Sequence, residues 1–357
     1  MNKDVSRIIE DYASRGEVSI ATLSSHSSLQ ILHGAKKEGF KTLLVTLASR
    51  EWFYRQFDHI VDKFIVVNGW KELCTGKVLE ELRRENAVMV PHGSIIEYVG
   101  LECAENIPVP YFGNRYLFRV ESDQRLKMQY LVESGIKTPR IYKYGGEIDK
   151  LVIVKLPGAK GGKGYFLSRS STHIKEKLEQ MAKEGAIKSV DDVIIQEYVI
   201  GTPAYFHYFY SPVLNRVEVL GADIRYESNV DGLRRVPLKY LAEDVEPSFV
   251  VTGNLPLVVR ESLLPTILEY GIKFVEYTRK QSPPGAIGPF CLESVVRDDL
   301  EIVVFEFSGR IVAGTNLYVS GSPYSYLYWD EPMSVGRRIA RELKLALKAA
   351  SLEKVLT

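Results

Sequence analysis

A lysine followed by a glycine-rich run is the sharpest chemical signal in this 357-residue sequence. Lys155 lies in the predicted strand 151–158, and the run that follows carries glycines and further lysines up to residue 164. Glycine allows positive φ and close backbone approach, so successive N–H groups can surround phosphate oxygens. The run is not a Walker A motif, and we expect a strand–turn–strand flap over a nucleotide, the alternative being a solvated hairpin. The candidate contacts are Lys155, Gly158, Lys160, Gly161, Gly162, Lys163 and Gly164.

Two glutamates in otherwise apolar predicted strands form the second signal. Glu293 lies in the strand 288–296 and Glu306 in the strand 301–310. A buried carboxylate is costly unless it is paired or bound to a cation, and two carboxylates from neighbouring strands can hold Mg²⁺ between nucleotide phosphates. Arg310 is placed to hold a phosphate group bidentately and is the candidate catalytic residue. The alternative is that each glutamate pairs with a structural arginine or lysine.

The run 194–201 is the third and weakest signal. It reads as a strand ending in Gln-Glu-Tyr-Val, and the backbone of Glu197, Tyr198 and Val199 could face the edge of an adenine ring. Many ordinary edge strands have the same appearance.

The elements that must position these residues fall into three predicted units. Residues 1–120 alternate strands with helices, which indicates a Rossmann-like parallel α/β domain. Residues 121–205 form a smaller unit that carries the flap. From 206 to 357 the strands are longer and alternate in polarity, which favours antiparallel pairing, and we expect helices on one face of that sheet. The fold class is therefore α/β combined with α+β.

The three signals, in this order, resemble the ATP-grasp superfamily. The resemblance rests on the lysine before the glycine-rich flap, the Glu-Tyr-Val-x-Gly hinge at 197–201, and two acids of which the second opens Glu-x-Ser-x-Arg. It implies the ATP-grasp fold, contact of Lys155 with ATP phosphates, and Mg²⁺, with Mn²⁺ also possible, on Glu293 and Glu306. The superfamily commonly has Asn where this chain has Ser308, which leaves direct metal ligation at that position in doubt.

Longer strings narrow the resemblance to the archaeal PurP family, formate–phosphoribosylaminoimidazolecarboxamide ligases. Among them are ATLSSHSSLQILHGAKKEGF at 21–40, RYESNVDGLRRVP at 225–237 and RIVAGTNLYVSGSPYS at 310–325. The similarity spans residues 18–357. It implies that His26, Ser94 and Asn254 contact the substrate 5-aminoimidazole-4-carboxamide ribonucleotide (AICAR), and that Glu227 contacts ATP.

The residues around His26 support this implication independently. The run Ser-Ser-His-Ser-Ser at 24–28 lies between a predicted strand and a predicted helix, where parallel sheets bind phosphate at a helix N-terminus. Ser27 or Ser28 can cap that helix, and the alternative for His26 is a capping or surface histidine.

The leading hypothesis is ATP- and formate-dependent formylation of AICAR through formyl phosphate, without folate, in purine (IMP) biosynthesis. The alternatives are another ATP-grasp carboxylate–amine ligase and a non-catalytic nucleotide-binding paralogue. The partners expected are the small molecules ATP, formate and AICAR, and the family resemblance implies a homo-oligomer.

Composition sets the remaining bounds. The formal net charge is +1, from 46 Lys and Arg against 45 Asp and Glu, and gives no global field to attract nucleic acid or a membrane. No apolar run is long enough to suggest a membrane span, and the N-terminus does not read as a secretory signal, so we expect a cytoplasmic enzyme. Cys74, Cys103 and Cys291 lie far apart, and we expect free thiols in a reducing compartment.

Overall fold

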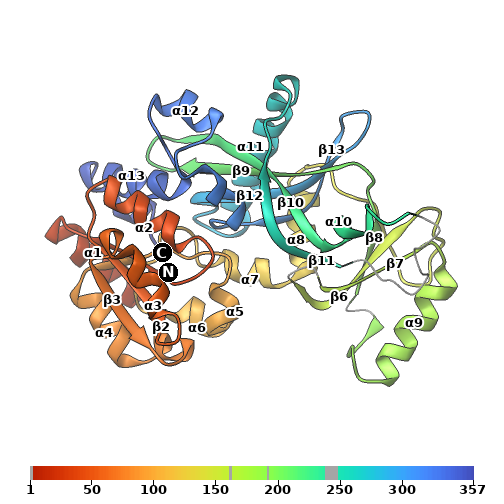
Figure 1. Ribbon diagram of the computed structural model, residues 1–357, viewed down its shortest axis with the longest axis horizontal. Coiled ribbons are helices and arrows are strands. Elements are labelled where there is room, and N and C mark those ends of the chain that lie inside the picture. Colours follow the sequence, from red (N-terminus) through yellow and green to blue (C-terminus); the bar gives the residue numbers. More distant parts are fainter. Residues whose placement is uncertain (1–2, 161–162, 191–192, 238–247) are drawn as a thin grey trace.

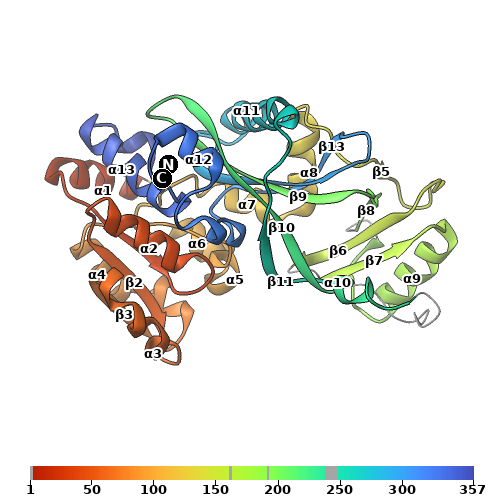
Figure 2. The same cartoon turned by 45° about the horizontal axis from the view of Figure 1, so that its top comes forward.

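Three β-sheets lie in a row in the computed structural model, which describes residues 3–160, 163–190, 193–237 and 248–357. The N-terminal sheet is at one end, the small sheet with its covering helix is at the other, and the large sheet lies between them (Figure 1). The same order is seen in the second view (Figure 2). Any site built from all three sheets must therefore be centred on the large one.

The N-terminal sheet is wholly parallel, with strand order β3-β2-β1-β4. The Rossmann-like prediction for this part is confirmed. The strand order reverses between β1 and β4, and in open parallel sheets ligands bind at such a point, outside the carboxyl ends of the strands. The elements are β1 (Ser19–Leu23), β2 (Thr42–Leu47), β3 (Lys63–Val67), β4 (Ala87–Met89), α1 (Lys3–Arg15), α2 (Ser28–Lys37), α3 (Glu51–Tyr54), η1 (Arg55–Ile60), η2 (Trp70–Cys74), α4 (Gly76–Arg84), α5 (Ile95–Val99), α6 (Leu101–Asn106) and α7 (Leu117–Ser122).

The small sheet has strand order β5-β8-β6-β7, and each of its neighbouring pairs is antiparallel. α9 packs on β7. α8, which precedes this sheet in the chain, packs instead against β13 and α11 of the large sheet. The elements are α8 (Gln124–Glu133), β5 (Ile141–Tyr142), β6 (Val152–Lys160), β7 (Lys163–Ser168), α9 (Ser171–Lys183) and β8 (Ile194–Glu197).

The large sheet is antiparallel throughout, with order β11-β10-β9-β12-β13, as the alternating polarity of the sequence predicts. Its hairpins and the helices after them form the rest of the chain. The elements are β9 (Thr202–Ser211), β10 (Arg216–Asn229), α10 (Val230–Leu233), β11 (Phe249–Pro256), η5 (Glu261–Leu263), α11 (Leu264–Gln281), β12 (Gly288–Val296), β13 (Ile302–Ser308), η6 (Ala313–Tyr318), α12 (Pro323–Trp329), α13 (Val335–Lys348) and η7 (Leu352–Lys354).

The two faces of the large sheet differ in chemistry. One face carries aromatic side chains such as Phe206, Phe290 and Phe307, which pack with α8 and α11 into one hydrophobic core. The prediction that helices cover only one face is wrong, because α13 packs on the other: the Arg338 guanidinium lies 4.0 Å from the centroid of the Phe209 ring. Period-two alternation places apolar and polar residues on opposite faces, and the polar face beyond α13 is left for a site.

α13 joins the large sheet to the N-terminal sheet by crossing α2 at very close range. A Cβ added to Gly34 on α2 would lie 2.1 Å from the backbone nitrogen of Arg337, and one added to Gly336 would lie 2.3 Å from the backbone oxygen of Gln30. On the sheet side, the buried Arg338 forms ion pairs with Glu218 at 2.9 Å and Glu342 at 2.8 Å. The close backbone contact between α2 and α13 therefore connects the two sheets.

The expectation of three free thiols is wrong for two of the cysteines. Cys74 at the end of η2 and Cys103 in α6 form a disulfide with Cα atoms 5.9 Å apart, a separation that suits such a bond. α5 lies between them in the chain, and its folding onto η2 brings together cysteines that are 29 residues apart. Cys291 is free and buried. Among the described residues, no helix has both the length and the apolar character needed to cross a membrane.

The crossing of α2 and α13 generates a stability prediction. Gly34→Ala should lower the free energy of unfolding by about 1–3 kcal/mol or more, because the added methyl overlaps backbone atoms that cannot turn away. Gly76→Ala on α4 is the matched control, since its Cβ would meet only a flexible side-chain oxygen at 3.7 Å. Chemical denaturation of both variants measures the difference. Equal stability of the two would show that the helices can separate without cost.

Candidate functional site

The two predicted acids are direct cross-strand partners on the polar face of the large sheet. Glu293 on β12 pairs in register with Glu306 on β13. The side chain of Glu293 is 7% exposed and that of Glu306 is 22% exposed. Like charges directly opposite each other destabilise a sheet, so cations must compensate them.

The negative charge of each glutamate is balanced by a different basic side chain. Arg225 on β10 binds the Glu293 carboxylate bidentately, with two contacts of 2.8 Å. Its guanidinium lies 3.9 Å from the centroid of the Tyr205 ring. Lys127 on α8 forms an ion pair with Glu306. The alternative, that each glutamate pairs with a basic residue, is therefore what the structure shows.

Lys155 completes this charged cluster from the small sheet. It is buried, 5% exposed, and its ammonium lies 5.5 Å from the centroid of the Phe305 ring. Burial lowers the pKa of Lys155, while Glu306 acts in the opposite direction. Burial alone would raise the pKa of Glu306, but Lys127 and Lys155 outweigh it and hold that pKa below its usual range. The cluster therefore keeps the Glu306 carboxylate ionised.

Arg310 follows β13 and is held by a buried carboxylate. It forms an ion pair of 3.0 Å with Glu121 of α7, which also accepts a hydrogen bond of 3.0 Å from the backbone of Gly309. The buried Nε of Arg310 has no hydrogen-bond partner among the described residues. Ser308 donates a 3.5 Å hydrogen bond to Glu293, so it supports an acid and its own metal contact remains untested. Arg310 thus retains a donor that a ligand oxygen could satisfy.

The glycine-rich flap is a hairpin, as predicted. β6 and β7 pair antiparallel, with Lys155 opposite Tyr165 and Lys160 opposite Lys163. Gly164 has φ of 81°, which only glycine adopts readily. Gly158 lies within β6, whereas Gly161 and Gly162 fall outside the described residues.

The hinge residues lie at the end of β8, beside the large sheet. The Glu197 carboxylate is paired with Arg297 at 2.9 Å and Lys150 at 3.3 Å. The Tyr198 backbone N–H donates to the Leu151 oxygen at 2.9 Å, just beyond the ends of β8 and β6. Burial raises the pKa of Tyr198, and the charge of Glu227 raises it further, so these two side chains are near each other. Glu227 on β10 and the hinge Glu197–Val199 are thus brought to one region, while their ligand roles stay predictions.

The loop that carries His26 is bent into an uncommon backbone conformation. Ser25 has φ of 121° and His26 has φ of 51°, values that non-glycine residues rarely adopt and that cluster at functional sites. Tyr98 donates a 2.7 Å hydrogen bond to Ser25, and Asn316 of η6 donates a 3.0 Å hydrogen bond to the His26 backbone oxygen. His26 contacts Ser27 at 2.8 Å. Ser27 is the N-cap residue of α2, but its side chain makes no capping hydrogen bond, so the capping prediction is wrong for it.

His92 is a residue that sequence reasoning left unassigned, and it supports His26. The two rings stack with centroids 5.3 Å apart, and His92 is fixed by contacts with the Leu23 oxygen at 3.0 Å and the Ser94 backbone N–H at 3.2 Å. Burial, with the nearby Arg310, lowers the pKa of His92 to about 4. Burial first, then His92 and Arg310, lower the pKa of His26 well below its ordinary value. Both rings are therefore neutral near pH 7.

Ser94 and Asn254 come from different sheets. Ser94 is the N-cap residue of α5, just after β4, so it and His26 lie on the two sides of the point where the strand order of the N-terminal sheet reverses. Asn254 lies on β11 opposite Arg225 of β10, and its amide donates a 2.6 Å hydrogen bond to Asp223. η6 links the two groups, because it contacts β10 and β11 and also reaches His26.

Sequence reasoning missed several residues that shape this face. Lys127 sits in an ordinary amphipathic helix, and Glu121 in a short one, so neither had a motif. Arg225 opens the run 225–237, but its partner depends on strand register, which the run does not reveal. The residues missed or unassigned are Glu121, Lys127, His92, Tyr205, His207, Asp223 and Arg225.

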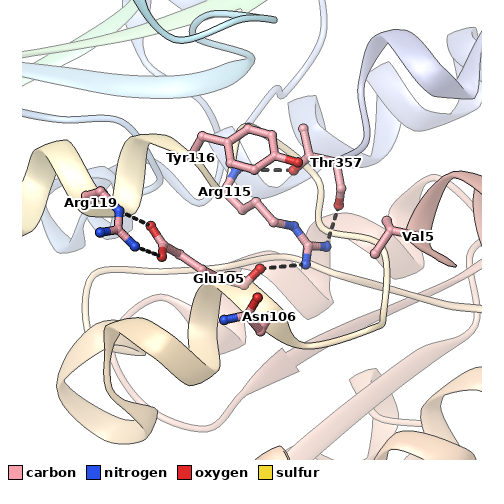
Figure 3. Close-up of a pocket in the computed structure, with 7 residues that line it drawn as sticks. All are labelled: Val5, Glu105, Asn106, Arg115, Tyr116, Arg119 and Thr357. Carbon is pink, nitrogen blue, oxygen red and sulfur yellow. Dashed lines mark hydrogen bonds and ion pairs between the residues drawn. The ribbon is translucent and has the colours of Figure 1, made fainter. Parts of the chain in front are cut away.

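A small pocket of about 240 Å³ lies elsewhere, beside α6 and the last residue of the chain (Figure 3). Its polar groups are largely committed to one another. Arg115 donates to the Thr357 oxygen at 2.5 Å and to three neighbouring carbonyl oxygens, and Arg119 is bound to Glu105. This pocket contains none of the predicted site residues.

The sheet arrangement, with a flap hairpin over paired acids, defines an ATP-grasp protein. N5-carboxyaminoimidazole ribonucleotide synthetase, solved as an ADP complex, shares the fold with a TM-score of 0.61 at 14% identity, covering 91% of this chain and 76% of that one. The IMP biosynthesis protein PurP from Thermococcus kodakaraensis matches with a TM-score of 0.74 and 34% identity, over 95% of this chain and 100% of that one.

The chain belongs to the family of 5-formaminoimidazole-4-carboxamide ribonucleotide synthetases. The proteins of that name from Ignicoccus hospitalis and Metallosphaera sedula are 54% and 57% identical to it, over 99% and 95% of this chain and 99% of each relative. The one from Methanocaldococcus jannaschii is 46% identical over the full length of both. Residues 20–142 match "Protein of unknown function (DUF1246)" and residues 173–357 match "Domain of unknown function (DUF1297)".

Glu227 generates a pH prediction. Burial raises its pKa from 4.5 to about 7, so the folded state holds the proton more tightly than the unfolded state. Its contribution to stability is therefore full below pH 4.5 and is lost as the pH rises towards 7. Relative to Glu227→Gln, the wild type should lose about 1–3 kcal/mol of unfolding free energy between about pH 4.5 and 8.

Urea denaturation at several pH values measures this difference. Glu276→Gln, an exposed substitution on α11, controls for the loss of a carboxylate. A difference between wild type and Glu227→Gln that stays constant with pH would mean that Glu227 titrates as an ordinary surface acid.

Proposed function

We propose that this chain catalyses the ATP-dependent formylation of AICAR by free formate, without folate, giving the 5-formamido product, ADP and phosphate in IMP biosynthesis. The observation that carries the proposal is the pairing of Glu293 with Glu306 on the face where Lys155 of the flap and Arg310 also gather. The proposal is supported by the names of relatives that are 46–57% identical over nearly the whole chain.

The chemistry needs two transfers that balance. A formate oxygen attacks the γ-phosphorus of ATP, the bond to the β-phosphate oxygen breaks, and ADP leaves with formyl phosphate formed. The 5-amino nitrogen of AICAR then attacks the formyl carbon, phosphate leaves with the former formate oxygen, and the amine loses a proton. Free formate is a poor acceptor of a nucleophile, so ATP is required to give it a good leaving group.

The residues would act by positioning and by neutralising charge. Lys155 and Lys127 would face the phosphates from the flap and from α8, and Arg310 would offer its free Nε to a transferred oxygen.

Glu197, Tyr198 and Val199 would border the adenine ring, with Glu227 near the ribose hydroxyls. His26, Ser94 and Asn254 would hold AICAR. Fixed donors placed where charge develops are worth most in a site that excludes water.

Glu293 and Glu306 fit a divalent cation. They lie opposite each other on neighbouring strands, and each already binds a positive group. Positive charge therefore stabilises this part of the site. Mg²⁺, or Mn²⁺ in its place, held by these two oxygen donors would neutralise the ATP phosphates. Oxygen atoms of ATP would complete the ligand set of such an ion.

The cellular compartment and the oligomeric state are proposed from the family resemblance. The enzyme would act on small molecules in the cytoplasm and assemble as a homo-oligomer.

Glu306→Gln should reduce formylation about 10²–10³-fold and leave AICAR affinity unchanged, because it removes a carboxylate where phosphate charge is neutralised but lies outside the AICAR contacts. Steady-state rates and AICAR titration calorimetry test this. Glu301→Gln, just before the same strand, is the matched control and should retain activity. Near-normal turnover of Glu306→Gln at moderate Mg²⁺ would remove Glu306 from the site.

The source of the formyl group gives the test of the function itself. With ¹⁸O-formate, ATP, AICAR and Mg²⁺, the released phosphate should carry one labelled oxygen, because formyl phosphate delivers it. Mass spectrometry of the phosphate measures this, and omission of AICAR is the control for leakage. Unlabelled phosphate, or activity with formyl-folate in the absence of ATP, would overturn the proposal.

A further inference from the structure

Three polar side chains on neighbouring strands form a buried chain of hydrogen bonds beside the charged cluster. His207 on β9 contacts Asp223 on β10 through Nε2 and Oδ1 at 2.7 Å. Asn254 on β11 donates from Nδ2 to the other Asp223 oxygen at 2.6 Å. The side chains of His207 and Asp223 are 2% and 1% exposed, whereas Asn254 is only partly buried. These hydrogen bonds thus connect the core of the sheet to the proposed AICAR site.

These hydrogen bonds fix the orientation of the Asn254 amide. An ionised carboxylate only accepts hydrogen bonds, so both neighbours of Asp223 must donate to it. His207 therefore carries its proton on Nε2, and Asn254 must turn its NH₂ group towards Asp223. The Asn254 oxygen Oδ1 is left to face away from Asp223, as an acceptor. An asparagine without such a partner could present either group.

The surroundings prevent Asp223 from turning. The backbone of η6 covers it so closely that a Cβ added to Gly314 would lie 2.3 Å from Asp223 Oδ1 and 2.9 Å from His207 Nε2. The same segment holds the loop of His26, because Asn316 donates to the His26 backbone oxygen at 3.0 Å. Asp223, Asn254 and His26 are therefore set relative to one another by one short helix.

We propose that Asp223, supported by His207, is a positioning residue that presents the Asn254 oxygen to the substrate and so selects a base that donates an N–H group. The inference rests on the proposed function, in which Asn254 contacts AICAR. AICAR offers such donors on its carboxamide and on its 5-amino group. A base with a carboxylate in place of the carboxamide would bring a second acceptor against Oδ1, and buried acceptors without a donor are strongly disfavoured.

Asp223→Asn tests the proposal because it should reverse the amide. The reversal requires that His207 keep its proton on Nε2. The single oxygen of the new side chain then accepts from His207, so its NH₂ group donates to Asn254 and forces the Asn254 NH₂ outward. AICAR affinity should fall about 10- to 100-fold, and the preference for AICAR over the carboxylate analogue should collapse. The affinity for a non-hydrolysable ATP analogue should stay within about two-fold, which a merely structural defect would not allow.

Three ligands are titrated by calorimetry: AICAR, its carboxylate analogue, and the analogue that lacks the 5-amino group. The two analogues distinguish which donor meets Asn254. Asn254→Ala should lose the same discrimination, and the exchange Asp223→Asn with Asn254→Asp should restore it, since an outward oxygen returns. Thr252→Ala, an exposed change on the same strand, is the matched control.

Two results would overturn the inference: an Asp223→Asn enzyme that discriminates among the three ligands as the wild type does, or a wild type that binds both analogues as tightly as AICAR. The second needs no variant, so the inference stays testable if Asp223→Asn fails to fold. Undiminished AICAR binding by Asn254→Ala would instead remove Asn254 from the proposed AICAR site. Absence of AICAR binding by the wild type would contradict the proposed function itself.

Discussion

Two carboxylates facing each other across neighbouring strands are the constraint on which the site depends. Glu293 and Glu306 are direct partners on β12 and β13, in a region shielded from solvent. The cost of burying two like charges so close is several kcal/mol unless positive groups surround them. The rest of the site can be understood as the supply of those positive groups from three directions.

The three directions are a strand of the large sheet, a helix packed on that sheet, and the small sheet. β10 provides Arg225, α8 provides Lys127, and the small sheet provides Lys155. These elements are separate in sequence, so the charge balance at the acids is complete only when the large sheet, α8 and the flap strand are all in place. By contrast, the N-terminal sheet contributes uncharged groups, since burial lowers the pKa of both His26 and His92. In the proposed function, the charged half would receive the triphosphate of ATP, and the neutral half would receive the base and the single phosphate of AICAR.

Sequence patterns predicted what depends on local periodicity. The parallel N-terminal sheet, the flap hairpin and the antiparallel large sheet follow from alternation, glycine spacing and strand length, and the two acids stood out because their strands are otherwise apolar. What failed depends on register and helix rotation. Nothing in the sequence around Lys127 says that it faces Glu306, and the Cys74–Cys103 disulfide joins η2 to α6 in a region where α5 packs on η2. Likewise, α13 covers the second face of the large sheet through contacts that span more than a hundred residues.

The internal ion pairs also mean that a bound nucleotide would have to break existing contacts in the site. Arg225 and Lys127 are already bound to Glu293 and Glu306, and Arg310 is already bound to Glu121. Under the proposed function, a phosphate or a metal ion would therefore exchange partners with these groups and would not simply add to them. Breaking a buried pair leaves an uncompensated charge, so a phosphate alone or a cation alone would gain little. The two together would restore the balance, because a cation would take the place of the basic side chains at the acids and those side chains would then be available to the phosphates. The proposed function therefore implies that metal and nucleotide bind as one complex.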